Sequence, residues 1–376
     1  MKRKKVLVNA YFAKNLGDDL FLKVLIDRYP KTSWYLMTPN KGYNKLFKNY
    51  QNVQIIRTMD VNLGIRKINL FNKMNESILN YRRYDALVNI GGSIFMESSN
   101  WEESLEIRSQ LPKKFKQANK QSFIIGANFG PFTDKQFVNK HREFFELFDD
   151  ICFRDIYSYN LFKKSSNVRY APDVVFNLHS QERDKEKCIG FSLISLENRK
   201  DLKQYADIFC MKMIQLVERY IEDGYKIKLF SFCEKEGDLK ISNYIKENIS
   251  SNYKELISVF NYEENIELFL EEFKRCETIV GARFHSIILA LLFKQGVFPI
   301  IYSDKTFNVL KDLDMNKLYC HIRDMDAIDV NNVVKNASYN IFNKVGVFQQ
   351  SEQQFKMLDE LLIGKKIRKG SKINES

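Results

Sequence analysis

The chain has 376 residues, 44% of them hydrophobic, which is enough for about two domains that each bury a core. With 15 glycines, six prolines and a formal net charge of +12, the composition excludes a disordered, collagen-like or low-complexity chain. The longest apolar run, Ile287–Phe293, is far shorter than the roughly 20 residues of a membrane-spanning helix, so we expect a soluble protein.

The first half of the chain alternates short apolar strands with helical segments. Strands are expected at Lys5–Ala10, Ser33–Met37, Val53–Ile56, Ala86–Ile90, Ser122–Gly126 and Ile151–Phe153. Helices are expected over 15–29, near Ile68–Tyr81, and at Glu102–Ala118, Phe137–Leu147 and Ile156–Lys164. This alternation predicts a mostly parallel sheet that is covered by helices on both faces.

The second half repeats the same rhythm after a polar stretch, His179–Lys187. Its strands are expected at Cys188–Ile194, Lys226–Phe230, Thr278–Val280 and Val297–Ile301, and its helices at Asp201–Asp223, Lys235–Asn248 and over 287–293. The sequence therefore predicts an N-terminal Rossmann-like domain over 1–180 and a C-terminal one over 186–345, followed by a terminal helix and basic tail over 346–376. Because ligands bind at the carboxyl ends of such strands, a cleft between two doubly wound domains is the expected site.

Several expected strands end in residues that suit a ligand site. Asn15 and Gly17 begin the first helix together with Asp18, although this segment taken alone favours an ordinary helix cap with acidic first-turn residues. Gly91 and Gly92 follow the strand that ends at Ile90, where backbone and ligand can approach closely.

Three more polar residues follow later strands of the first domain. Asn128 lies in a glycine-containing loop after the strand that ends at Gly126. Arg154 follows Phe153, and an arginine in this position can bind a carboxylate or phosphate through two hydrogen bonds, or pair locally with Asp155. Asp173 follows Pro172 and either faces the cleft or caps the next turn.

The sharpest feature lies in the second domain, over 281–286. Arg283 and His285 stand where a strand passes into an apolar helix, beside the free N–H groups of the helix N-terminus, which predicts an anion site. Lys305, in the loop after the next strand, is expected close to His285. The other histidines, His141, His179 and His321, lie in polar segments that we expect to be exposed, and they receive no role.

These segments occur in an order that resembles the polysaccharide pyruvyl transferase family. The resemblance rests on NLGDD, GGS, GANFGP, FRDIYS, APD, GARFHS and YSDK, which begin at positions 15, 91, 126, 153, 171, 281 and 302. Many members have a third glycine where this chain has Ser93, and leucine is commoner than Phe284, but neither change removes a functional group.

The resemblance implies a fold similar to that of the two-domain GT-B glycosyltransferases. It also implies transfer of pyruvate from phosphoenolpyruvate onto two hydroxyls of a sugar, with formation of a cyclic ketal. By resemblance, Arg154, Arg283, His285 and Lys305 surround phosphoenolpyruvate, whose phosphate and carboxylate these cations match. His285 is suited to act as general acid or to hold the leaving phosphate, and Asp18 or Asp173 to deprotonate a sugar hydroxyl.

The expected partners are phosphoenolpyruvate and a sugar or polyprenyl-linked oligosaccharide. We expect no metal and no cofactor, because no His/Cys spacing of a metal site occurs and the donor substrate supplies the pyruvyl group. No nucleic acid is expected, since no aromatic RNA-binding motif accompanies the basic charge. Six scattered cysteines without a close pair predict reduced thiols and a cytoplasmic protein. The two basic ends are expected either to be solvated tails or to contact anionic lipid at the inner face of the membrane.

Two other functions fit the same sequence. A GT-B glycosyltransferase would use the same two domains and the same anion site for the diphosphate of a nucleotide sugar. A non-catalytic member of a polysaccharide assembly complex would fold in the same way and bind glycan without a donor substrate, but the presence of Arg283, His285 and Lys305 speaks against it.

Overall fold

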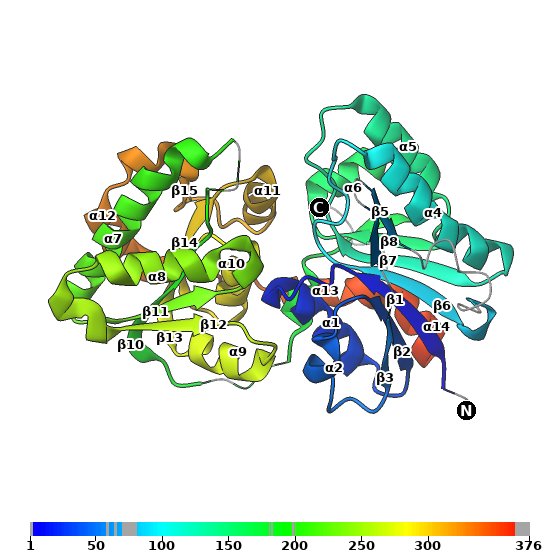
Figure 1. Ribbon diagram of the computed structural model, residues 1–376, viewed down its shortest axis with the longest axis horizontal. Coiled ribbons are helices and arrows are strands. Elements are labelled where there is room, and N and C mark those ends of the chain that lie inside the picture. Colours follow the sequence, from blue (N-terminus) through cyan, green and yellow to red (C-terminus); the bar gives the residue numbers. More distant parts are fainter. Residues whose placement is uncertain are drawn as a thin grey trace, which may run out of the picture. The chain divides into compact units, whose positions relative to one another are not determined.

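The chain folds into two α/β units, which the computed structural model describes over residues 3–57, 60–63, 66–69, 81–179, 181, 183–197, 199 and 201–364 (Figure 1). The first unit comprises residues 1–11, 24–174 and 348–376, and the second comprises 12–23 and 175–347. Each unit contains one parallel sheet with helices packed on it.

The first unit is built on a seven-stranded parallel sheet in the order β3-β2-β1-β6-β7-β8-β9. Its strands are β1 (Lys5–Ala10), β2 (Ser33–Thr38), β3 (Val53–Arg57), β6 (Ala86–Ile90), β7 (Gln121–Ala127), β8 (Asp150–Phe153) and β9 (Val168–Tyr170). The helices between them are α1 (Leu16–Arg28), α2 (Tyr43–Leu46), α4 (Trp101–Gln117), α5 (Lys135–Phe145) and α6 (Ile156–Phe162). A separate antiparallel pair is formed by β4 (Asp60–Leu63) and β5 (Arg66–Asn69).

The second unit is built on a six-stranded sheet in the order β12-β11-β10-β13-β14-β15. Its strands are β10 (Glu186–Ser192), β11 (Lys226–Ser231), β12 (Ile257–Asn261), β13 (Cys276–Gly281), β14 (Gly296–Ile301) and β15 (Cys320–His321). Its longer helices are α7 (Ala206–Glu222), α8 (Asp238–Asn248), α9 (Ile266–Lys274), α10 (Phe284–Leu292), α11 (Asp304–Asp312) and α12 (Val330–Asn336). Short 3-10 turns include η3 (Lys203–Tyr205) and η4 (Glu234–Glu236), and the chain ends in α13 (Val347–Ser351), η8 (Glu352–Phe355) and α14 (Lys356–Ile363).

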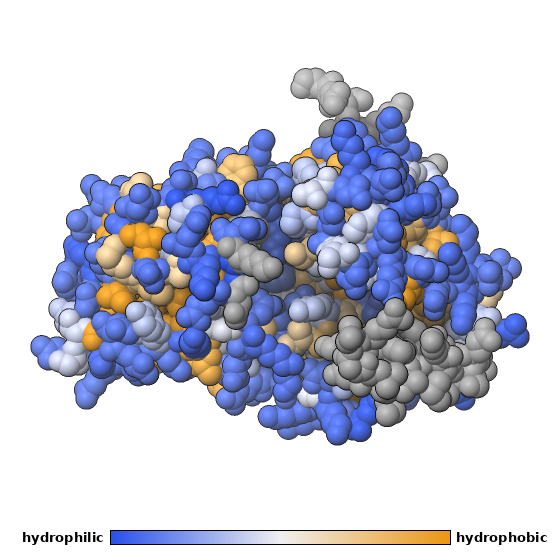
Figure 2. All heavy atoms as spheres, turned by 45° about the horizontal axis from the view of Figure 1, so that its top comes forward, coloured by the Kyte–Doolittle hydropathy of each residue, from blue (hydrophilic) through white to orange (hydrophobic). Residues whose placement is uncertain are grey.

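The central strands are largely buried because helices cover both faces of each sheet. Every residue of β14 is buried, and so is every residue of β8. In the second unit, Phe209, Met213 and Leu216 on one side of α7 are completely buried against the sheet. The face shown in Figure 2 is mostly hydrophilic, with small separate hydrophobic patches. Within the described part of the chain, no helix has the length and apolar character needed to cross a membrane.

The two doubly wound α/β units confirm the fold class predicted from the sequence, and most predicted elements occur within a few residues of their expected bounds. The sequence missed β12 and α9, which lie between two predicted elements. It placed a helix near Ile68–Tyr81, but Ile68 belongs to strand β5, and residues 70–80 lie outside those described. The expectation that His141 is exposed was wrong, because its ring is 2% exposed among aromatic side chains.

The division into units differs from the expected linear order in two segments. Residues 12–23, which include the start of α1, group with the second unit, whereas 348–364 return to the first. The physical reason is hydrogen bonding across long sequence separations. The Leu16 amide donates to the Phe232 carbonyl at 3.1 Å, and the Tyr262 hydroxyl donates to buried Asp19 at 2.7 Å.

Candidate functional site

The strand order of the second sheet makes the carboxyl ends of β10 and β13 a candidate ligand site. Chain connections leave β10 in one direction along the sheet and β13 in the other, and such switch points are where open α/β sheets bind ligands. The two strand ends are joined by a 2.8 Å hydrogen bond from the Ala282 amide to the Ser192 carbonyl. Polar residues follow four adjacent strands here, β11, β10, β13 and β14.

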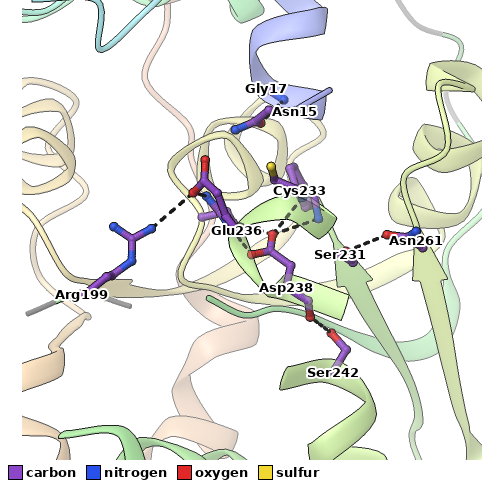
Figure 3. A network of polar contacts seen from close by, with 11 residues as sticks. Asn15, Gly17, Arg199, Ser231, Cys233, Glu236, Asp238, Ser242 and Asn261 are labelled. Carbon is purple, nitrogen blue, oxygen red and sulfur yellow. Dashed lines mark hydrogen bonds and ion pairs between the residues drawn. The ribbon is translucent and has the colours of Figure 1, made fainter. Parts of the chain in front are cut away.

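Arg283, which caps α10, is buried in a network of carboxylates. Its Nε donates to Asp238 at 2.8 Å, its Nη2 donates to the same carboxylate, and its Nη1 donates to Glu236 at 2.6 Å. Asp238 is fully buried and also accepts the backbone N–H groups of Phe232 and Cys233 (Figure 3). Burial alone would lower the pKa of Arg283, but the two carboxylates raise it, so the guanidinium stays charged.

Glu236 connects Arg283 to two further cations. Arg199, in the loop after β10, lies with Nη2 3.4 Å from a Glu236 oxygen, as Figure 3 shows. Burial would raise the pKa of Glu236, but Arg283, Arg199 and Lys305 together lower it, so the carboxylate is ionised. Three cations therefore surround Glu236 at the carboxyl edge of this sheet.

Tyr302, directly after β14, lies among the same charges. The Arg199 guanidinium carbon is 4.7 Å from the centre of the Tyr302 ring, and the Lys305 ammonium is 5.8 Å from it. Burial would raise the pKa of the phenol, yet Lys305, Arg283 and Arg199 lower it. A phenol whose pKa falls despite burial indicates a positive potential, which is what an anion-binding site requires.

His285 follows Arg283 in the first turn of α10 and packs against the start of α1. A side chain added at Gly17 would place its Cβ 1.9 Å from the His285 Nδ1 atom, so only glycine fits beside the ring. Phe21 lies edge-on to the imidazole, with ring centres 5.3 Å apart. The Asn15 side chain accepts the Gly17 amide at 3.0 Å and so fixes this turn, as the sequence predicted.

The predicted residues of the first unit form a second polar cluster at the carboxyl ends of β6 to β9. Arg154, 2% exposed, donates to Asp173 at 2.9 Å and to the Asn128 side chain at 2.7 Å. Gly92 lies against the guanidinium, since a Cβ there would be 2.5 Å from an Arg154 nitrogen. Ser93 donates to the same Asn128 oxygen at 3.1 Å. The cluster thus consists of the buried Arg154–Asp173 ion pair and the Asn128 amide oxygen, which also accepts from Arg154.

Asp155 is the N-cap residue of α6. Its carboxylate caps α6 by accepting the Ser158 amide at 2.7 Å and the Ser158 hydroxyl at 2.9 Å. The Ser158 oxygen then accepts the Phe129 amide at 2.7 Å. The FRDIYS segment thus ties the loop after β7 to the start of α6.

The structure therefore sorts the predicted site residues into two groups. Gly91, Gly92, Asn128, Arg154 and Asp173 lie in the first unit, and Asn15, Gly17, Asp18, Arg283, His285 and Lys305 lie in the second. Asp18 is half-buried in the first turn of α1. Sequence reasoning missed Arg199, Glu236, Asp238 and Tyr302. They lie in the segments that follow β10, β11 and β14, and this position is the signal that would have found them.

Metal ligation has no candidate among the side chains that the structure describes. No group of three or more His, Cys, Asp or Glu residues in these ranges is arranged to hold a metal ion. The six cysteines are free thiols, and Cys210 alone is partly exposed among them.

Several solved structures share this fold. HepE of Anabaena, solved in complex with UDP, has a TM-score of 0.57 at 7% identity, with 96% of this chain and 100% of HepE covered. MurG of Acinetobacter baumannii has a TM-score of 0.51 at 12% identity, covering 97% of this chain and 100% of MurG. At these identities the likeness shows the fold alone, which is the GT-B fold with two Rossmann-like domains that the sequence predicted.

Sequence comparison is more specific. The amylovoran biosynthesis protein AmsJ of Erwinia amylovora is 22% identical over 384 residues, covering 86% of this chain and 89% of AmsJ. The profile of the family described as polysaccharide pyruvyl transferase matches residues 15–304. This range begins at Asn15 and ends at Asp304, one residue before Lys305, and it contains the other residues of both polar clusters. The chain belongs to the polysaccharide pyruvyl transferase family.

Proposed function

We propose that this protein transfers the pyruvyl group of phosphoenolpyruvate onto two hydroxyls of a sugar in an exopolysaccharide precursor, forming a cyclic ketal. The observation that carries the proposal is the cationic cluster of Arg199, Arg283 and Lys305, in a chain of this family. The name of AmsJ, a protein of amylovoran biosynthesis, supports the exopolysaccharide context.

The donor substrate fits this cluster by charge. Phosphoenolpyruvate carries a phosphate and a carboxylate, and three cations with the N-terminus of α10 offer matching charges and N–H groups. Arg283 would supply positive potential and hold the carboxylates in place, because its three nitrogens already donate to Asp238 and Glu236. Lys305 and His285 would contact the substrate.

The reaction balances without a further reagent. A proton adds to the methylene carbon of phosphoenolpyruvate and turns it into a methyl group, while one sugar hydroxyl attacks the central carbon. The carbon–oxygen bond to phosphate then breaks, and the second hydroxyl attacks the same carbon and closes the ketal. Of the two protons that the hydroxyls lose, one balances the proton added to the methyl group and the other leaves with hydrogen phosphate. His285 would deliver the proton or stabilise the leaving phosphate. The proposed reaction uses no cofactor.

Asp18 is the better candidate for the general base. Asp173 is 1% exposed and accepts a hydrogen bond from Arg154 at 2.9 Å, which suits a residue that positions the first-unit cluster. Asp18 is half-buried on the turn of α1 that contains Gly17, and Gly17 contacts His285. Asp18 would therefore act from the same helix as Gly17, which packs against His285, the proposed acid.

The proposal includes a cytoplasmic location at the inner face of the membrane, with a polyprenyl-linked acceptor. Exposed Arg3 and Lys4 support contact with anionic lipid. The other basic stretch, over 365–372, lies outside the described residues.

The test is phosphate release from phosphoenolpyruvate in the presence of a panel of oligosaccharide acceptors, with the ketal detected as added mass. His285→Ala should lower turnover by about 100-fold or more while the thermal melting curve stays that of the wild type. Near-normal phosphate release by His285→Ala would remove this residue from the mechanism. Turnover of a nucleotide sugar without use of phosphoenolpyruvate would instead assign the protein to the glycosyltransferases.

A further inference from the structure

Arg199 is the most accessible guanidinium of the second-unit cation cluster. Its side chain is 29% exposed, compared with 7% for Arg283, and it reaches the cluster from the loop after β10. That loop is fixed locally, since the Arg199 amide donates to the Leu196 carbonyl at 3.0 Å and the Arg199 carbonyl accepts the amides of Leu202 and Lys203. None of the motifs that resemble the family contains this residue.

Two of the contacts of Arg199 differ in kind. Its guanidinium lies over the Tyr302 ring at 4.7 Å, which orients the planar group without using its N–H donors. The contact with Glu236 is longer, 3.4 Å, whereas the Arg283–Glu236 distance is 2.6 Å. The Glu236 side chain is itself 33% exposed. The Arg199–Glu236 pair is therefore the accessible and loosely bonded edge of the network.

We propose that Arg199 is an anion-binding residue of this site, and that Glu236 is its internal counter-ion, which a phosphate group displaces. The identity of the phosphate as that of phosphoenolpyruvate rests on the proposed function. The anion site itself rests on the geometry of Arg199, Glu236, Tyr302 and Lys305.

A counter-ion is needed because neighbouring cations repel one another electrostatically. Arg199, Arg283 and Lys305 repel one another where water is partly excluded, and Glu236 offsets that repulsion when the site is empty. A phosphate dianion brings more charge than one carboxylate and several acceptor oxygens. Phosphate can therefore accept hydrogen bonds from the Arg199 guanidinium while Glu236 keeps its short hydrogen bond to Arg283.

The ligand class follows from the side chains present. The planar Arg199 guanidinium and the Lys305 ammonium both lie near the Tyr302 ring. Together they can bind different oxygens of a tetrahedral phosphate monoester, because these oxygens point in several directions. Arg199 lies in the segment after β10 and Lys305 in the first turn of α11, after β14, so the two groups approach such a ligand from separate elements.

Calorimetric titration of the full chain with inorganic phosphate tests the site without any reaction. Arg199→Gln should weaken binding by about tenfold or more, and Arg199→Lys should weaken it less, because the charge remains while the fork is lost. Glu236→Gln should strengthen binding several-fold, because it removes the competing carboxylate. Arg219→Gln is the matched control, since Arg219 lies on α7 and pairs with Asp223 and Glu222. It should bind phosphate like the wild type.

Two results would overturn the inference. One is phosphate binding by Arg199→Gln within twofold of the wild type, and the other is weakened binding by a Glu236→Gln variant that melts like the wild type. The same titrations with phosphoenolpyruvate separate the two proposals. Phosphate binding that depends on Arg199, without turnover of phosphoenolpyruvate by the wild type, would reject the proposed function and keep the anion site. Turnover of phosphoenolpyruvate by the wild type, together with phosphate binding that does not depend on Arg199, would keep the proposed function and reject the anion site.

Discussion

At the scale of single residues, the contact between Gly17 and His285 decides whether the imidazole can take its place. Gly17 lies in the first turn of α1, where alanine would otherwise be favoured by about 1 kcal/mol. A Cβ at this position would lie 1.9 Å from the His285 Nδ1 atom, so the ring must move. The glycine is thus explained by space and not by backbone conformation.

We therefore expect Gly17→Ala to lower phosphate release from phosphoenolpyruvate by about tenfold or more while the fold persists. The matched control is the double variant Gly17→Ala/His285→Ala. It should be no less active than His285→Ala alone, since both changes act on the same imidazole. Wild-type activity in Gly17→Ala would show that the His285 position does not matter for turnover.

At the scale of elements, Arg154 joins the turns after β7, β8 and β9, because it forms an ion pair with Asp173 and donates to Asn128. Both side chains are almost completely buried, at 2% and 0% exposure. Removing one partner of such a pair leaves a buried charge uncompensated. The Asn128 oxygen also accepts a hydrogen bond from Arg154, but it is neutral and does not replace the lost charge of the carboxylate.

Asp173→Asn should accordingly lower the free energy of unfolding by about 3 kcal/mol or more, measured by urea denaturation at pH 7. Glu143→Gln serves as the control in the same unit. It removes the charge from an exposed i,i+3 pair with Lys140, and should change stability by less than about 1 kcal/mol. Equal effects of the two variants would contradict the buried pair.

Helix α5 contributes a buried histidine to an aromatic cluster. The His141 Nδ1–H donates to the Phe137 carbonyl at 2.7 Å, and the ring lies 4.2 Å from that of Phe137 and 5.1 Å from that of Phe129. Burial, reinforced by nearby Arg108, lowers the pKa of His141 to about 4. The folded protein therefore keeps this imidazole neutral at pH values where the unfolded chain protonates it.

The unfolded chain binds this proton near pH 6.5 and the folded one only near pH 4, so stability is lost as pH falls between these values. The full loss is about 3 kcal/mol for a shift of this size. In urea denaturation between pH 7 and pH 4, His141→Phe should show a flatter decline than the wild type. An identical pH dependence in the two proteins would mean that His141 titrates normally.

At the scale of the whole molecule, the last helices belong to the first unit, although they follow the second unit in the sequence. The Gln354 side chain accepts the Gly126 amide at 3.0 Å and donates to the Ala171 carbonyl at 2.7 Å, so it joins β7 to the turn after β9. Asp359 accepts two hydrogen bonds from Arg28 and one from the Tyr29 hydroxyl. These contacts span more than 180 residues of sequence.

Gln354→Ala should destabilise the first unit by about 1–3 kcal/mol, because it leaves buried backbone groups without their partner. Hydrogen exchange should then increase in β7 to β9 and stay unchanged in β10 to β14. Gln353→Ala is the neighbouring control, since Gln353 is exposed and its backbone carbonyl, which the substitution keeps, accepts from Arg169. Loss of protection in both units of Gln354→Ala would contradict the assignment of this segment to the first unit.

The sequence by itself determined the fold class and most of the strand-end positions. Apolar runs such as Val297–Ile301 and helical spacing such as that around Phe209 are local signals, and buried parallel strands depend on them. The order of the strand-end motifs likewise placed Arg154, Arg283 and His285 at the carboxyl edges of their sheets, because a parallel sheet brings these edges together.

Only the tertiary structure decided which residues meet. Sequence spacing does not reveal that Arg283 is bonded to Asp238, 45 positions away, or that Gly17 packs on His285 in the other half of the chain. It also misjudged His141, whose polar neighbours along α5 face water while the ring faces the aromatic cluster. These contacts join elements that are distant in sequence, so they depend on how the helices pack on the sheet, which the local pattern of residues does not specify.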